Sequence, residues 1–309
     1  MKKPIINLLA FGIAIVFSAC NEDEVDPLSD YVTPTDFNVT VESVVTTDVA
    51  VEDAVESIDY EVDLFTGTAD MIAELSAESM ESDQLKSSLT SQFQDRYTNG
   101  EVPDITVDWT NGDYPCTITL DYGEETTLAN GRVISGTLAI TLSGSLTTEE
   151  VTRTATFTNL TVDSVTINGS IVKNISSVTE EREVYIVRDL EFTLPDSTTL
   201  NCYAAITRTW EEGIDTPFYY LDDVMTIEGY GTCTDSDGNQ YRRDITNTLQ
   251  KQGGCRYLVS GTVSYSANGL TFATVDYGDG TCDNIGTFTS INGETEFIIG
   301  ERVRERISK

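Results

Sequence analysis

Residues 152–157 read Thr-Arg-Thr-Ala-Thr-Phe and residues 117–120 read Thr-Ile-Thr-Leu, so polar and apolar side chains alternate with a period of two. Successive side chains of a β-strand point to opposite faces, and this alternation is typical of strands with one buried face. The chain from residue 100 onward is rich in Thr and Val in the same manner. We therefore predict an antiparallel β domain over residues 100–309.

Turn signals punctuate this domain. Asn-Gly and Asp-Gly pairs favour the tight turns of two-residue hairpins, and no long helical pattern separates the strands, which argues against parallel pairing. We predict a mainly β fold of about twelve strands in succession, forming an extended antiparallel meander sheet or an open β-sandwich with short N-terminal helices packed on it. The Asx-Gly pairs that we take as turn signals are those at residues 130–131, 168–169, 237–238, 268–269 and 292–293.

The segment before the β domain, residues 44–99, has a helical period. Apolar residues between 51 and 62 recur at intervals of three and four, and Asp48 is placed as an N-cap. Weaker helical patterns follow over residues 69–80 and 83–97. Each helix is expected to have one apolar face, which docks on the sheet.

The N-terminus has the pattern of an export signal. Lys2 and Lys3 precede an apolar run that ends at Val16, and Cys20 follows small residues. The run is too short to span a bilayer, which requires about 20 residues. The pattern resembles a bacterial lipobox, which implies that residues 1–19 are removed as a lipoprotein signal peptide and that Cys20 is diacylated. Two acyl chains anchor a protein stably to a membrane.

Residues 20–43 are predicted to form an acidic tether. Glu22, Asp23 and Glu24 resemble the export signal of Bacteroidota surface lipoproteins, and the alternative is a solvated acidic linker. The resemblance implies lipid anchoring to the outer membrane, at the cell surface.

The charge balance is strongly acidic. The chain has 52 acidic and 18 basic residues and a formal net charge of -34. Binding to nucleic acid depends on neutralising phosphates with Lys and Arg, so we exclude nucleic acid as a partner. Between Asn21 and Leu85 there are nineteen acidic residues and no basic one. This stretch is either extended by self-repulsion or balanced by cations from elsewhere.

Three stretches carry a family resemblance. They are residues 255–262 (Cys-Arg-Tyr-Leu-Val-Ser-Gly-Thr), 276–284 (Asp-Tyr-Gly-Asp-Gly-Thr-Cys-Asp-Asn) and 130–136 (Asn-Gly-Arg-Val-Ile-Ser-Gly). Together they resemble a broad group of uncharacterised Bacteroidota surface lipoproteins over about residues 105–300. The resemblance implies the location and the β fold, and it implies no activity.

The cysteines point to disulfide bonds, since an exported chain crosses an oxidising compartment. A hairpin centred on residues 268–269 brings Cys255 opposite Cys282 if its register runs unchanged, although a bulge near Gly278 would shift it. No CxxC spacing exists and the chain has no histidine, so no metal site is predicted. The predicted disulfides are Cys255–Cys282 and Cys202–Cys233, and Cys116 is left over.

The absence of histidine removes Ser-His-Asp and Cys-His catalysis and any histidine-bearing zinc site. What remains is a pair of carboxylates, as in glycan hydrolases, and with 52 acids some pair meets the required spacing by chance. No cofactor is predicted.

Residues 210–220 form a candidate ligand loop that mixes aromatic and acidic side chains. Aromatic faces beside carboxylates suit sugar rings, and the alternative is that the aromatic residues fold back into the core. Two short Asp-Ser patterns, at Ser164 and Ser197, resemble O-glycosylation sites of Bacteroidota secreted proteins. The aromatic residues of the loop are Trp210, Phe218, Tyr219 and Tyr220.

From the sequence we expect a surface-exposed, lipid-anchored, β-rich binding or structural module. Its expected partners are the membrane, through the N-terminal lipid, and a glycan, a host protein or another envelope component. The competing hypothesis is a carboxylate-type glycan hydrolase.

Replacing the lipidated cysteine tests the anchor. Cys20→Ala is expected to release the protein from the membrane, because no other stretch of the sequence is apolar enough to hold it there. Membrane fractions washed with high salt are compared for both proteins by immunoblot. Retention of the variant at the wild-type level would contradict the lipoprotein assignment.

Overall fold

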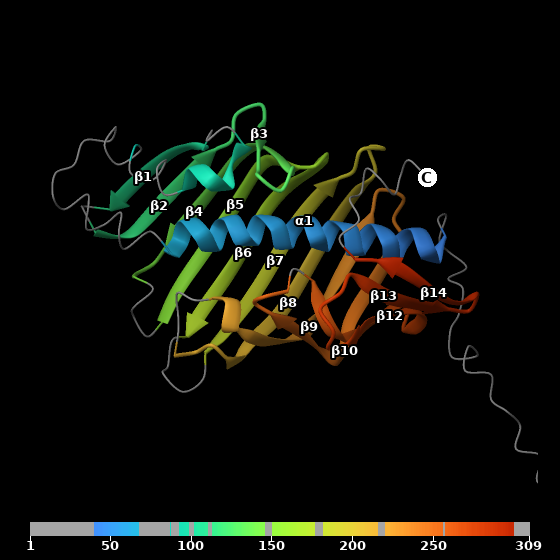
Figure 1. Cartoon of the computed structure of the whole chain (residues 1–309). Coiled ribbons are helices and arrows are strands. Elements are labelled where there is room, and N and C mark those ends of the chain that lie inside the picture. Colours follow the sequence, from blue (N-terminus) through green and yellow to red (C-terminus); the bar gives the residue numbers. More distant parts are fainter. Residues whose placement is uncertain are drawn as a thin grey trace, which may run out of the picture.

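The computed structural model describes residues 40–67, 87, 93–98, 102–110, 113–145, 150–176, 182–215, 220–255 and 257–299. Within these residues the protein is one open, 14-stranded antiparallel sheet with a long helix lying across it (Figure 1). The predicted mainly β meander is confirmed, as a single open sheet.

The strands follow one another along the sheet in chain order, and each pairs with the next. The exception is β3, which pairs with β4 alone, so that β2 and β4 are neighbours. The strands are β1 (Asp104–Thr110), β2 (Asp113–Asp121), β3 (Thr126–Thr127), β4 (Val133–Leu142), β5 (Glu150–Val162), β6 (Val165–Ser176), β7 (Glu183–Thr193), β8 (Thr199–Glu212), β9 (Val224–Asp235), β10 (Gln240–Gln252), β11 (Leu258–Ala267), β12 (Leu270–Asp279), β13 (Ile285–Ser290) and β14 (Gly293–Ile298).

Most of the Asx-Gly pairs lie at turns, but Asn168-Gly169 does not. It lies inside β6, where Asn168 stands opposite a bulge of β5 and Gly169, with a φ of 109°, pairs with Phe157. The turn between β5 and β6 is instead Asp163-Ser164, with positive φ at both residues. A Cβ at Gly169 would lie 2.2 Å from the Asp189 carbonyl oxygen, so this glycine is required by a close approach and not by a turn.

The first of the expected helices is present as α1 (Val41–Gly67), which is 27 residues long. It begins after Thr40, whose Oγ1 accepts a hydrogen bond from the Ser43 backbone N–H at 3.1 Å, so Thr40 is the N-cap. The prediction that Asp48 is the N-cap is wrong: Asp48 lies in the second turn and is buried. The pattern at 69–80 lies outside the described residues, and the described part of 83–97 contains the short 3₁₀ helix η2 (Gln94–Arg96). A second one, η4, spans Tyr220–Asp222.

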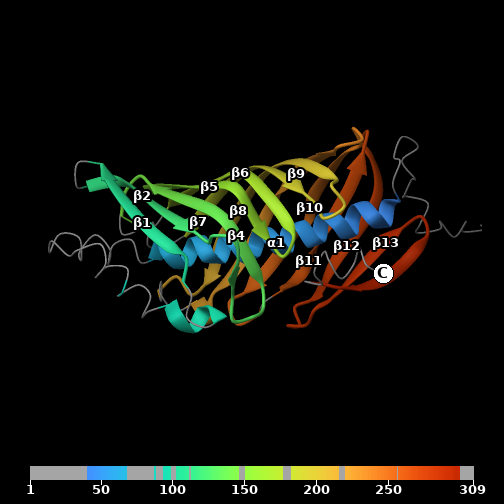
Figure 2. The ribbon, with the colours of Figure 1, turned by 90° about the horizontal axis from the view of Figure 1, so that it is seen from above.

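The helix does not have the single apolar face that was predicted. Four consecutive residues, 48–51, are all buried, which requires cover on every side. Figure 2 shows the reason: the strands arch over one side of α1, and the C-terminal strands turn round it near its N-terminus. No described helix is long and apolar enough to cross a membrane.

The core therefore lies between the helix and the inner face of the sheet. In β5 and β7 alternate residues are buried, as the period of two in the sequence requires. Fully buried side chains come from both layers, including Ile58 and Phe65 of α1 and Leu138 and Phe192 of the sheet.

Two disulfide bonds are present, and they are the two pairs expected from the sequence: Cys202–Cys233 and Cys255–Cys282. The first joins directly paired residues of β8 and β9. The second joins residues just outside the paired parts of β11 and β12. Between Ala267↔Leu270 and Ser260↔Asp279, β12 has two more residues than β11, so the register shifts by two before the cysteines. Cys116, which belongs to neither bond, is buried in the core.

Candidate functional site

Five strands each direct a basic side chain toward α1, from positions where an apolar residue is expected. Arg188, for example, shares the inner face of β7 with Ile186 and Leu190, and its exposed fraction is only 3%. A cation at such a position is costly unless it is paired. The five are Arg153 of β5, Lys173 of β6, Arg188 of β7, Arg208 of β8 and Arg243 of β10.

The helix supplies the matching anions. Asp48, Glu52, Glu56, Asp59 and Asp63 recur every three or four residues and form a stripe along one side of α1. From Asp48 to Asp63 the helix rises about 22 Å at about 1.5 Å per residue. From β10 to β5 the sheet spans five steps of about 4.8 Å, or about 24 Å. A helix lying across the strands therefore brings about one acid to each strand (Figure 1).

The resulting ion pairs form a continuous row, which we call the charge ladder. Glu52 accepts hydrogen bonds from Arg188 at 2.8 Å and is 2.7 Å from Arg243. Arg208 bridges Glu56 at 2.5 Å and Asp59 at 3.2 Å. Lys173 lies 2.6 Å from Asp59 and 3.5 Å from Asp63, and Asp63 also pairs with Arg153.

Strand β9 contributes space instead of charge. A Cβ at Gly231 would lie 2.7 Å from Nε of Arg243, which is too close. The bare backbone of β9 therefore lets the Arg243 side chain lie across it toward Glu52. This explains how a cation of β10 meets the same carboxylate as Arg188 of β7.

Both ends of the ladder are closed by tyrosines. Asp48 accepts hydrogen bonds from the hydroxyls of Tyr241 at 2.9 Å and Tyr265 at 3.0 Å, and from Arg243 at 3.3 Å. Glu61 near the other end is fully buried and accepts hydrogen bonds from Tyr97 at 2.7 Å and Tyr122 at 3.2 Å, and from Arg96. Each of these buried carboxylates thus accepts from two tyrosine hydroxyls and one arginine.

Burial and pairing oppose one another along the ladder. Burial acts to raise the pKa of Asp59, but Lys173 and Arg208 outweigh it and hold the pKa far below its usual value. The pKa of Glu52 is lowered in the same way, by Arg243 and Arg188 against burial. At Asp48 burial prevails over Arg243 and raises the pKa. Burial also lowers the pKa of Lys173, despite Asp59 and Asp63.

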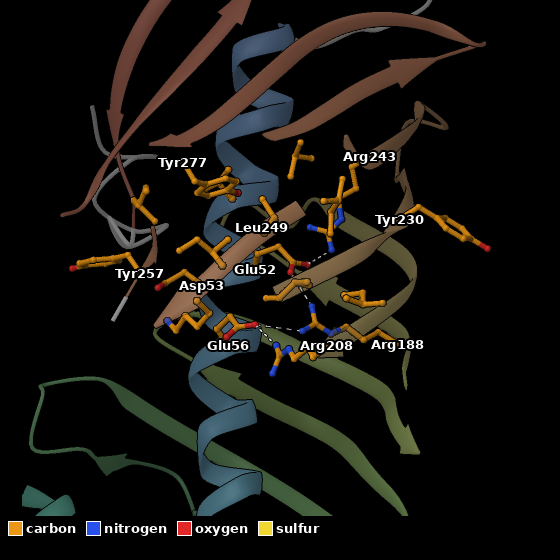
Figure 3. Close-up of a pocket in the computed structure, with 18 of the residues that line it drawn as sticks. Glu52, Asp53, Glu56, Arg188, Arg208, Tyr230, Arg243, Leu249, Tyr257 and Tyr277 are labelled. Atoms are coloured by element: carbon orange, nitrogen blue, oxygen red, sulfur yellow. Dashed lines mark hydrogen bonds and ion pairs between the residues drawn. The ribbon is translucent and has the colours of Figure 1, made fainter. Parts of the chain in front are cut away.

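A pocket of about 110 Å³ lies beside the ladder, between α1 and strands β8–β12 (Figure 3). Its walls are mostly apolar, and they meet the charged side chains of Glu52, Glu56, Arg188, Arg208 and Arg243. The apolar lining includes Val49, Ile206, Ile227, Ile245, Leu249 and Val263.

Interrupted strand pairing makes room for this pocket. Between Asp244↔Tyr230 and Leu249↔Ile227, strand β10 has two more residues than β9. Strand β10 also changes register three times against β11. Bulges of this kind bend a strand and re-aim its side chains, and they are common beside functional sites. The bulged segment carries Ile245 and Leu249 into the pocket wall.

One carboxylate in the pocket is incompletely paired. Glu56 has an exposed fraction of 42% at its side chain, and only its Oε1 contacts the arginines. Its Oε2 has no hydrogen-bond donor among the described residues, whereas Glu52 uses both oxygens. The Nε groups of Arg188 and Arg208 are buried without an acceptor within the same part of the chain.

The structure does not bring Trp210 of the sequence-predicted loop into this pocket. Trp210 lies near the end of β8 and packs locally: its Nε1 donates to Asp223 at 3.1 Å, and the Arg182 guanidinium lies 4.3 Å from its ring centroid. Trp210 is thus folded back against the protein, which was the alternative expectation. Phe218 and Tyr219 lie outside the described residues, as does the side chain of Tyr220, which begins η4.

The other predicted residues are distributed elsewhere. Ser164 and Ser197 are exposed at the β5–β6 and β7–β8 turns, both with positive φ. Their glycosylation stays a prediction. Cys20, Glu22, Asp23 and Glu24 lie outside the described residues.

The charge ladder was missed at the level of sequence, although a signal exists. Arg153, Lys173 and Arg188 each occupy the apolar parity of their strands, and the acids of α1 recur with the helical period. The nineteen-acid stretch was expected to be either extended or balanced by cations, and its described helical part is balanced by these strands.

No protein-family model, no curated protein and no solved structure matches this chain.

Removing one buried cation of the charge ladder is expected to destabilise the fold. Arg188→Ala leaves Glu52 with one cation fewer in a buried site, and the free energy of unfolding is expected to fall by about 3–5 kcal/mol. Arg242→Ala is the matched control, because Arg242 is exposed and pairs with Asp244 on the sheet surface. Its expected loss is below about 1 kcal/mol. Urea unfolding measures both, and equal losses would contradict a structural role for the ladder.

The ladder also predicts acid sensitivity. Glu52 and Asp59 have lowered pKa values in the fold, so their stabilisation is complete above their unfolded-state values of about 4 and is lost as the pH falls further. Asp48, with its raised pKa, has the opposite sign and offsets part of this loss. The urea midpoint is expected to change little from pH 7 to 5 and to drop toward pH 3. Asp59→Asn should flatten that drop, and an unchanged drop would assign the acid sensitivity to other groups.

Proposed function

We propose that this protein is a lipid-anchored binding module of the outer membrane surface and that its binding site is the pocket beside the charge ladder. The export pattern of residues 1–24 and the acidic tether support the location. A folded domain carried on a tether of this kind extends away from the lipid surface, where it meets ligands.

One observation supports this choice of site: an unfilled, mostly apolar cavity lies directly beside the ion pairs of the charge ladder. An unfilled cavity of 110 Å³ costs on the order of 2–3 kcal/mol at about 24 cal/mol per Å³. Around Ile134 and Leu138 the inner face is closed by fully buried side chains. A ligand that fills the cavity recovers this cost, so the cavity supports binding.

The ligand classes expected from the sequence, a glycan, a host protein or another envelope component, stay predictions. No contact in the described residues favours the glycan hydrolase. Glu52 and Glu56 are one turn apart on the same helix, and arginines bind both. A lowered pKa keeps Glu52 ionised at neutral pH, whereas a general acid must hold a proton there.

Filling the pocket tests this proposal. In Ile245→Phe the larger side chain of a half-buried wall residue occupies the cavity. A set of small apolar probes of each charge type, namely hexanol, hexanoate and hexylamine, is titrated into residues 21–309 and followed by NMR. At least one probe is expected to shift signals of pocket residues in the wild type and to lose that effect in the variant.

The matched control enlarges an inner-face residue of the sheet that does not line the pocket. Ile175→Phe on β6 changes a half-buried inner-face isoleucine in the same way, and binding should survive it. If no probe shifts pocket signals, or if Ile245→Phe leaves binding unchanged, the pocket is not the binding site.

A further inference from the structure

We infer that the pocket binds a small organic carboxylate, whose apolar part enters the cavity while its carboxylate replaces Glu56 on Arg208 and Arg188. This inference rests on the proposed function, since it names the ligand class of the same site. It follows from the size of the cavity, the arrangement of the guanidinium groups and the exposure of Glu56.

The cavity sets the size of the apolar part. Its volume is about 110 Å³, and its apolar walls are branched aliphatic and tyrosine side chains, mainly from α1 and from β8 to β12. A dry protein cavity of about 150 Å³ holds one benzene molecule. The space therefore suits a single ring or a chain of about four to six carbons, and it is too small for a long acyl chain or a disaccharide.

The arginines set the charge of the polar end. Arg188 and Arg208 line the pocket, and Arg243 lies beside them (Figure 3). The planar guanidinium matches a carboxylate through two parallel N–H donors. Arg188 stays anchored by Glu52 at 2.8 Å, and Arg208 by Asp59 at 3.2 Å, when Glu56 moves away. The donors are thus held in place for an incoming anion.

Glu56 is the replaceable member of the ladder. It contacts the arginines through Oε1 alone, at 2.5 Å from Arg208 and 3.6 Å from Arg188, and it is the half-exposed acid at this site. Glu52, by contrast, is held through both oxygens by two arginines. Rotation of Glu56 into solvent leaves two buried guanidiniums with unpaired N–H groups, including the Nε atoms that lack an acceptor. A ligand carboxylate satisfies these donors.

The sign of one substitution distinguishes this mechanism from binding of a cation. Glu56→Gln removes the competing anion, so the affinity for hexanoate is expected to rise by roughly two- to fivefold, the value of a partly exposed ion pair. If the pocket instead takes an amine through the free Oε2 of Glu56, the same substitution weakens binding of hexylamine and leaves hexanoate without effect. Isothermal titration calorimetry on residues 21–309 measures each ligand.

Asp63→Asn is the matched control. Asp63 is a half-exposed ladder acid that pairs with Arg153 and Lys173 and does not line the pocket. Its substitution should leave the hexanoate affinity within the error of the wild type. An equal rise in both variants would show a general effect of net charge and would overturn the replacement of Glu56.

The outcomes separate this inference from the proposed function. Hexanoate binding that exceeds hexanol and hexylamine binding, is abolished by Ile245→Phe and rises with Glu56→Gln supports the inference. Pocket binding by hexanol or hexylamine with none by hexanoate overturns the ligand class and leaves the proposed function in place. Absence of pocket binding by all three overturns both. Circular dichroism of each variant verifies that it is folded.

Discussion

The pairing of buried charges between helix and sheet is the constraint on which this fold depends. A helix with an acid on almost every turn cannot enter a protein interior unaccompanied, because each unpaired carboxylate costs several kcal/mol. Five strands of the sheet each supply a cation, and the observed placement of the helix pairs all five. The apolar contacts around Ile58 and Phe65 hold the layers together, while the ion pairs define the helix register.

The shape of the sheet follows from the same constraint. Fourteen strands in one open sheet would present a broad inner face to water if nothing covered it. The helix is buried on every side over Asp48–Val51, so the C-terminal strands must curl round it there. The tyrosines of β10 and β11 complete that enclosure by donating to Asp48.

The strands were predictable from the sequence because their signal is local: a period of two, with Asx-Gly turns, does not depend on partners. The helix was only partly predictable. Its apolar period was visible in the sequence. Asp48, however, is a residue type that favours an N-cap position, and only its long-range partners show that it lies in the core. Likewise Asn168-Gly169 has the backbone freedom of a turn but lies inside β6, opposite a bulge of β5. The pocket could not be predicted, since it arises where β10 carries two extra residues against β9.

The charge ladder also affects the order in which the chain folds. Asp48 and Arg243 are 195 residues apart, and Asp48 and Tyr265 are 217 apart, so α1 acquires its last partners only when the strands near the end of the chain are present. High contact order of this kind slows folding, and a lone acidic helix gains little from its own hydrogen bonds. The helix α1 therefore stays undocked until these partners have formed. The fold becomes cooperative only once its C-terminal hairpins are in place.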